Sequence, residues 1–170
     1  MKLTLARFQR DSRLLDACAS IYGQTWNRSV SDARWTFEEY VTFPHFQGVV
    51  AYWDQEEIGF ALGAQSLPGQ WWHDCVAAHL GSDHPALQDA FILCELAVLP
   101  LYRNMGIGRQ IHDALLAAQP MPNALLSTMA SNAGALRFYQ RLDWSIVHPG
   151  IQFFSGQEPY AILAKRLLVD

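Results

Sequence analysis

The sequence predicts an α+β domain, and three observations lead to this fold class. The length of 170 residues favours one domain. Apolar residues make up 51% of the chain and charged residues 16%, which is enough apolar material to fill a core. The hydrophobic spacing switches repeatedly between the two-residue period of strands and the 3.6-residue period of helices. With no repeat or linker, we expect a single domain over residues 1–170.

The first third of the chain predicts a strand, two helices and a hairpin. Residues 2–8 alternate as in a strand, and residues 12–26 place their apolar side chains at helical spacing. Residues 36–43 predict a second, shorter helix before a proline. Residues 46–53 and 58–66 then predict two strands joined by a polar turn.

An insert over about residues 67–89 follows, and it is too long for an ordinary connection. Trp72, Val76 and Leu80 recur at i, i+4 and i+8, so part of the insert predicts an amphipathic helix. Gly81 is placed to end that helix.

The second half alternates strands with helices. Residues 90–99 are apolar at nearly every position, as expected of a central strand covered on both faces. A helix follows, with a buried stripe formed by Ile107, Ile111, Leu115 and Ala118. The other expected elements are a strand over 123–130, a helix over 131–142 with Ser131 or Asn132 as N-cap, and closing strands over 144–154 and 159–168.

Charge and cysteine content exclude several classes of protein. The formal charge of −4 offers no basic field for a nucleic-acid backbone. Cys18, Cys75 and Cys94 are widely spaced and form no metal or redox motif. No segment approaches the roughly 18 apolar residues of a membrane span, and none resembles a signal peptide. We therefore expect a cytoplasmic protein with no metal, no nucleic-acid partner and no membrane partner.

The stretch "ELAVLPLYRNMGIGRQIHDALL" contains the most informative pattern in the chain. Gly106 and Gly108 stand where a strand passes into a helix, and neither has a Cβ that would block an approaching ligand. The N–H groups at a helix start carry about half a positive charge, and Arg103 and Arg109 can add to it. The turn therefore suits a phosphate or pyrophosphate, unless the glycines merely cap a tight junction.

Two common phosphate-binding signatures do not match this turn. A P-loop needs Lys-Ser/Thr where Arg109 and Gln110 follow the glycine. A dinucleotide fingerprint needs a third glycine where Ile111 stands. A kinase or a dehydrogenase is therefore disfavoured. Another kind of nucleotide-binding enzyme stays an alternative.

Two motifs together resemble the GNAT superfamily of acyl-CoA-dependent N-acyltransferases. The first is "RNMGIG" over 103–108, which matches the family's Arg/Gln-x-x-Gly-x-Gly/Ala signature. The second is "SNAGALRFYQRLDW" over 131–144, similar to the second half of the family's cofactor site. Asp143 departs from the pattern, because the family usually has glycine there, and the insert is longer than the family's usual connection. The resemblance implies a central mixed, mostly antiparallel sheet of six to seven strands with helices on both faces.

The resemblance also implies acetyl-CoA as co-substrate and a set of residues that bind it. The pyrophosphate would lie on the amides of the glycine turn, and the pantetheine arm along the strand before it. The implied binding residues are Leu96, Ala97, Val98, Arg103, Asn104, Met105, Gly106, Ile107, Gly108, Arg109, Asn132, Ala135, Phe138 and Tyr139.

The expected chemistry needs a proton acceptor and a proton donor. A lysine-like amine is neutral to about one part in 2,500 at pH 7, a handicap of about 4.6 kcal/mol that a base removes. Glu95 is the candidate base, because a carboxylate on a buried strand is costly without a role; the alternative is a Glu at the strand end paired with an arginine or facing water. Tyr139 occupies the family's general-acid position, and its alternative is a core aromatic. The N–H of Val98 is the candidate for stabilising the oxyanion.

For the acceptor, we expect binding residues among Trp26, Trp35, Trp72 and His148. Trp71 and Trp72 can equally anchor the insert to the core. The sequence thus predicts an acetyl-CoA-dependent N-acetyltransferase that acts on a small-molecule or peptide amine by direct attack in a ternary complex. The alternative is a non-catalytic acyl-CoA-binding or sensing module. The identity of the amine is not specified, and a homodimer stays open.

Overall fold

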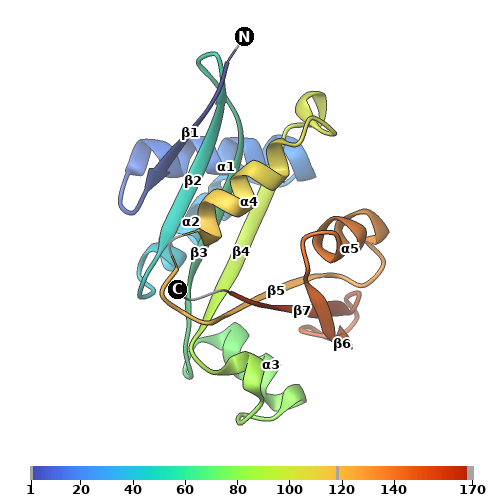
Figure 1. The fold of residues 1–170 in the computed structure, drawn as a ribbon. Coiled ribbons are helices and arrows are strands. Elements are labelled where there is room, and N and C mark those ends of the chain that lie inside the picture. Colours follow the sequence, from blue (N-terminus) through green and yellow to red (C-terminus); the bar gives the residue numbers. More distant parts are fainter. Residues whose placement is uncertain (1, 118, 168–170) are drawn as a thin grey trace. The chain divides into compact units, whose positions relative to one another are not determined.

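Seven strands form a mixed sheet in the order β1-β2-β3-β4-β5-β7-β6 in the computed structural model (Figure 1). The structure describes residues 2–117 and 119–167. The strands are β1 (Leu3–Phe8), β2 (Gln47–Trp53), β3 (Glu56–Ser66), β4 (Ala90–Val98), β5 (Asn123–Met129), β6 (Ser145–Ile151) and β7 (Tyr160–Arg166). The helices are α1 (Ser12–Trp26), α2 (Val30–Val41), α3 (Trp71–Leu80), α4 (Ile107–Leu116) and α5 (Ala133–Gln140). The predicted α+β class and strand number are confirmed.

The chain divides into two compact units, which are described separately. The first unit comprises Met1–Ala64 and Leu93–Gln119, and the second comprises Gln65–Ile92 and Pro120–Asp170. The predicted stripe position Ala118 and the predicted strand end at Leu168 lie outside the described residues.

The strands of the first unit are antiparallel neighbours. β1 pairs with β2 from Leu3 opposite Trp53 to Phe8 opposite Gly48, and β2 pairs in the same sense with β3. The N–H of Leu99, just after β4, donates to the carbonyl of Ile58 at 2.8 Å. The end of β4 therefore lies beside the start of β3, and these two strands also run in opposite directions.

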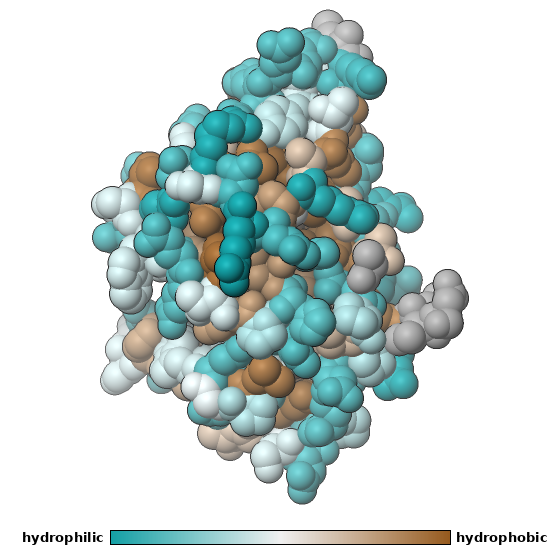
Figure 2. Space-filling view, turned by 90° about the vertical axis from the view of Figure 1, so that its left-hand side faces the viewer, coloured by the Kyte–Doolittle hydropathy of each residue, from teal (hydrophilic) through white to brown (hydrophobic). Residues whose placement is uncertain are grey.

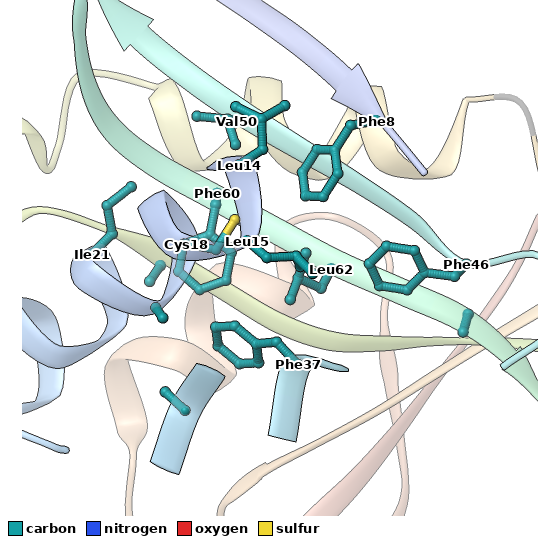
Figure 3. Close-up of a cluster of buried hydrophobic side chains, with 14 residues drawn as sticks. Phe8, Leu14, Leu15, Cys18, Ile21, Phe37, Phe46, Val50, Phe60 and Leu62 are labelled. Carbon is teal, nitrogen blue, oxygen red and sulfur yellow. The ribbon is translucent and has the colours of Figure 1, made fainter. Parts of the chain in front are cut away.

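Helices cover both faces of the sheet in the first unit. Side chains alternate across a strand, so Phe60 and Leu62 of β3 point to one face, where they join the main apolar core with α1 and α2 (Figure 3). Gly59 faces the opposite side, where a Cβ would come within 2.9 Å of Ile111 Cδ1 of α4. The glycine thus permits α4 to approach β3 closely.

Helix α2 begins earlier than the sequence pattern predicted. It starts at Val30 rather than near residue 36, because Ser29 is its N-cap and accepts the Asp32 N–H at 3.2 Å. Ala33 and Phe37 form its buried face. α1, by contrast, occupies residues 12–26 as predicted.

The second unit is built around β5. β5 runs parallel to the start of β4 over Ala90–Ile92 and antiparallel to β7, and β7 pairs with β6. The insert contains α3, which ends at Leu80, and Gly81 follows with φ 91°. The predicted helix and its glycine stop are confirmed.

Helix α5 of the second unit resolves the two N-cap candidates in favour of Asn132. Its Oδ1 accepts the N–H of Ala135 at 3.0 Å, whereas the Ser131 hydroxyl donates to Glu158. After the helix, Asp143 adopts a left-handed conformation with φ 66°. This is the position where the family usually has glycine, and the backbone conformation explains that preference.

Polar side chains cover much of the face in Figure 2, and apolar side chains show between them. Large apolar residues exposed elsewhere in the described chain include Leu101 at 90% and Trp35 at 70%. Within residues 2–117 and 119–167, no helix combines the length and the apolar character that a membrane crossing requires.

Candidate functional site

The glycine turn presents unpaired amides to open space. Gly106 is the N-cap of α4 with φ 76°, and no side chain caps the helix. The N–H groups of Ile107, Gly108 and Arg109 lie in the first turn, where they have no partner within the helix. A Cβ placed on Gly106 would meet nothing within 4 Å. The amides are therefore free to bind an anion, which fits the phosphate role predicted for this turn.

Two arginines flank this turn in different ways. Arg103 Nε donates to the carbonyl oxygen of Val98 at 3.2 Å, so the side chain ties the turn to the end of β4. Arg109 is exposed, and its Nε lies 3.5 Å from an oxygen of Asp113 one helical turn away. Asp113 therefore offsets part of the charge of Arg109, while Arg103 also has a structural role.

The described pairing of β4 with β5 ends before the segment that leads to the turn. The parallel pairing with β5 covers Ala90–Ile92, so the pairs described for that strand do not extend to Leu93–Val98. Unpaired backbone groups along a strand edge can accept an added extended chain with peptide-like groups. Residues 96–98 therefore fit the predicted contact with a pantetheine arm.

A cavity of about 230 Å³ lies between the first two helices and β4 in the same unit. Its wall combines charged, hydroxyl and apolar side chains. They are Tyr22, Arg28, Ser29, Asp32, Ala33, Thr36, Phe37 and Glu95. The inner wall is apolar, since Ala33 and Phe37 are buried, and the outer residues Arg28, Ser29 and Asp32 are exposed.

Glu95 brings a carboxyl group into this cavity. The residue is half-buried, and burial raises the pKa of the carboxyl to about 8. Burial is also the main cause that raises the pKa of Tyr40, and the charge of Glu95 adds to it. Among the described residues, no cation forms an ion pair with Glu95. A carboxyl that titrates close to neutral pH is suited to accept a proton from a bound ligand.

Tyr139 and Asn132 lie in the second unit and are held by its own packing. Tyr139 is 8% exposed, with its ring against Phe138 at 5.0 Å and against Trp144 at 5.9 Å between centroids. Asn132 caps α5, because its Oδ1 accepts the N–H of Ala135, a half-buried residue in the first turn of the helix. The core-aromatic alternative for Tyr139 matches this packing, and its role as general acid stays a prediction.

The comparison with known families decides what kind of protein this is. The model of the family described as "Acetyltransferase (GNAT) domain" matches residues 44–146, which is more than half of the chain. This chain belongs to the GNAT acetyltransferases. The family normally uses acetyl-CoA, and the glycine turn is the part of this GNAT chain that fits its pyrophosphate.

Several known proteins are similar to this GNAT chain. A GCN5-like protein acetyltransferase of Mycobacterium tuberculosis is 35% identical over 120 residues, which are 65% of this chain and 58% of that protein. The chain thus spans less than two thirds of the length of that relative. The ribosomal-protein-S18-alanine N-acetyltransferase of Escherichia coli has a TM-score of 0.70 at 18% identity, covering 99% of this chain and 96% of that one. PH1933 of Pyrococcus horikoshii has a TM-score of 0.71 at 14% identity, covering 99% and 100%. These two solved structures show the shared fold.

The four residues predicted for the acceptor lie in different surroundings. Trp26 on α1 and Trp35 on α2 are exposed and do not line the cavity of this GNAT chain. The Trp72 indole N–H donates to the Ser127 hydroxyl at 3.0 Å, so Trp72 anchors α3 to β5. His148 on β6 lies in the second unit, where its ring is 5.6 Å from that of His79 on α3. Their role toward an acceptor stays a prediction.

The sequence analysis missed the outer wall of the cavity. Arg28, Ser29, Asp32 and Thr36 were not singled out, because α2 was expected to start later. The signal that could have found them is the Ser29-x-x-Asp32 spacing, which is typical of a capped helix start. Among the described residues, no group of three or more His, Cys, Asp or Glu side chains could hold a metal ion.

Proposed function

We propose that this protein is an acetyl-CoA-dependent N-acetyltransferase that moves an acetyl group to a primary amine of a small molecule or a peptide by direct attack. The observation that carries the proposal is the arrangement along β4. Glu95 places an ionisable carboxyl in a cavity, and the backbone of Leu96–Val98 follows immediately and leads to the bare amides of α4. Acceptor and donor sites are thus adjacent on one strand.

The residues of the first unit would hold the donor in two places. The amides of Met105–Arg109 would bind the pyrophosphate, and the backbone of Leu96–Val98 would bind the pantetheine arm. Acetyl-CoA supplies the thioester carbonyl that is attacked. In this assignment the Val98 N–H stabilises the negative charge that develops on the carbonyl oxygen.

Two proton transfers complete the reaction. A bond forms between the amine nitrogen and the acetyl carbonyl carbon, and the carbon–sulfur bond breaks. The nitrogen must lose a proton, which Glu95 accepts, and the departing thiolate must gain one, which Tyr139 donates. A pKa near 8 makes Glu95 a better proton acceptor than an ordinary carboxylate, because the driving force for transfer from an amine is less unfavourable.

The experiment is thiol release from acetyl-CoA over an amine panel, with wild type, Glu95→Gln and Tyr139→Phe. Loss of a general acid or base typically costs about 10²- to 10⁴-fold in rate. We expect losses in kcat of at least about a hundredfold for both variants. Acetyl-CoA affinity should change little, because Glu95 is not in the implied binding set and Tyr139→Phe keeps the aromatic ring and removes only the hydroxyl.

Tyr160→Phe serves as the control, since Tyr160 is a half-buried tyrosine of β7 in the second unit that is packed against Phe153. It should retain wild-type turnover. Binding of acetyl-CoA without thiol release for any amine would contradict the proposal and favour the non-catalytic binding module.

A further inference from the structure

The outer wall of the cavity carries a cationic group with no ionic partner. Arg28 follows Asn27, the left-handed residue that ends α1, and directly precedes Ser29, the N-cap of α2. Among the described residues, no carboxylate lies within ion-pair distance of its guanidinium. Arg28 is exposed at the outer wall, whereas Glu95 lies at the more buried part.

The turn that carries Arg28 is held in place by close packing. The Arg28 N–H donates to the Gly23 carbonyl at 3.2 Å. A Cβ on Gly23 would lie 2.6 Å from a methyl carbon of Val30 and 3.1 Å from the Arg28 carbonyl oxygen. The backbone of Arg28 is therefore fixed relative to the start of α2, at the point where the residue lines the cavity.

The other polar groups of the outer wall are already engaged. The Thr36 hydroxyl donates to the Asp32 carbonyl at 3.1 Å, and the Ser29 hydroxyl accepts the Asp32 N–H. The Asp32 carboxylate lies in the first turn of α2, where the positive end of the helix dipole compensates its charge. Arg28 thus remains as the strong donor that is free to bind an anionic group.

The size of the cavity limits what can enter. About 230 Å³ is below the roughly 300–1,000 Å³ typical of sites for drug-sized ligands, and it corresponds to about eight water volumes. A molecule that the cavity encloses is therefore small, and with its amine at Glu95 its remaining groups lie near the other residues that line the cavity.

We propose that this cavity selects a small aminocarboxylic acid, with its amine at Glu95 and its carboxylate bound by Arg28. The inference rests on the proposed function and narrows its acceptor to one chemical class. Arg28 is a specificity-determining residue in this account and takes no part in proton transfer. A planar guanidinium can bind a carboxylate through two parallel hydrogen bonds, which a neutral carboxamide cannot reproduce.

The test compares alanine, leucine, phenylalanine and glutamate with their carboxamides and with the matching decarboxylated amines, assayed by thiol release. An amino acid and its carboxamide differ in the pKa of their amino groups. The informative quantity is therefore the ratio of kcat/KM for the acid to kcat/KM for the amide, measured in each variant. A charge-assisted hydrogen bond contributes about 1.5–3 kcal/mol. We therefore expect Arg28→Gln to lower that ratio by roughly tenfold or more, through a higher KM for the acid at nearly unchanged kcat.

Arg10→Gln is the matched control, because Arg10 lines a different cavity of the same unit and its replacement removes the same charge. It should leave the ratio unchanged. A ratio unchanged in Arg28→Gln, or equal turnover of acids, amides and decarboxylated amines by wild type, overturns this inference and leaves the proposed function standing. Thiol release with none of these amines, but with larger amines or peptides, also overturns it. If no amine of any size gives thiol release, the proposed function is overturned as well.

Discussion

Glu95 is the residue on which both the proposed chemistry and a cost in stability depend. Its carboxyl lies in a cavity whose apolar inner wall cannot solvate a charge, and this burial raises its pKa to about 8 from the 4.5 of an ordinary glutamate. A group of this kind is destabilising to the fold once it ionises, so its presence on a buried strand indicates a functional role.

The pH dependence of stability follows from these two pKa values. Between pH 4.5 and pH 8 the folded chain keeps a proton that the unfolded chain has lost, so the free energy of unfolding falls as pH rises through this range. We expect Glu95→Gln to be more stable than wild type at pH 9 by roughly 2 kcal/mol, below the upper bound of about 5 kcal/mol because water reaches the half-buried residue.

At pH 5 the difference between wild type and Glu95→Gln should nearly vanish. Urea denaturation at both pH values measures it, with Glu56→Gln as the control, since Glu56 is exposed at the start of β3. A stability difference that is the same at both pH values would show that ionisation of Glu95 is not its cause.

A substitution at Gly106 tests the part of the proposed site that would bind acetyl-CoA. The left-handed φ of 76° at this glycine costs an alanine about 1 kcal/mol, and a Cβ would occupy the open space before the amides of α4. We expect Gly106→Ala to weaken acetyl-CoA binding by about tenfold or more, as measured by calorimetry.

Gly156→Ala is the control for Gly106→Ala. Gly156 has nearly the same φ, 80°, and a Cβ there also meets nothing within 4 Å. Both variants should lose similar stability, and only Gly106→Ala should lose affinity. Equal affinity in the two would place the pyrophosphate elsewhere.

At the scale of elements, α3 shows how the insert is fastened. Trp72 packs in the apolar cluster of the second unit and donates to Ser127, while its neighbour Trp71 is 54% exposed and stacks on Phe154 at 5.1 Å. The two tryptophans are adjacent in sequence but differ in burial and hydrogen bonding.

This difference predicts unequal effects of the same substitution. Trp72→Phe should lower the free energy of unfolding by about 1–3 kcal/mol, because it leaves the partly buried Ser127 hydroxyl without its donor and removes packed volume. Trp71→Phe should change it by less than about 1 kcal/mol. Thermal or urea denaturation compares the two, and a larger loss for Trp71→Phe would contradict the anchoring role of Trp72.

Elements with a strong local signal were predictable from sequence. The apolar spacing of α1 and α3, the stop at Gly81 and the glycine turn before α4 all depend on residues close to one another in the chain. The start of α2 was missed because polar residues occupy its first turn, where the N-cap at Ser29 rather than apolar periodicity sets the boundary.

At the scale of the whole molecule, the sequence was sufficient for the family and for the sheet of seven strands, and insufficient for the cavity that contains Glu95. The family signature consists of two local motifs, so two short segments, 103–108 and 131–144, are enough to indicate the family. The cavity is lined by α1, the turn after it, α2 and β4, and residues from segments about 60 positions apart meet there only through packing. Arg28 had no local feature that marked it, and the role proposed for it rests on the cavity that it lines together with Glu95.

The pH dependence of turnover tests the central claim that Glu95 receives the amine proton. The measurement is kcat for thiol release at saturating acetyl-CoA and amine from pH 6 to 9.5, for wild type and Glu95→Gln. We expect wild-type kcat to rise with pH to a plateau, with an apparent pKa above that of an ordinary carboxylate because burial raises the pKa of Glu95, and we expect Glu95→Gln to be slower by about a hundredfold and to lack this rise. An identical profile and rate in Glu95→Gln would contradict the claim.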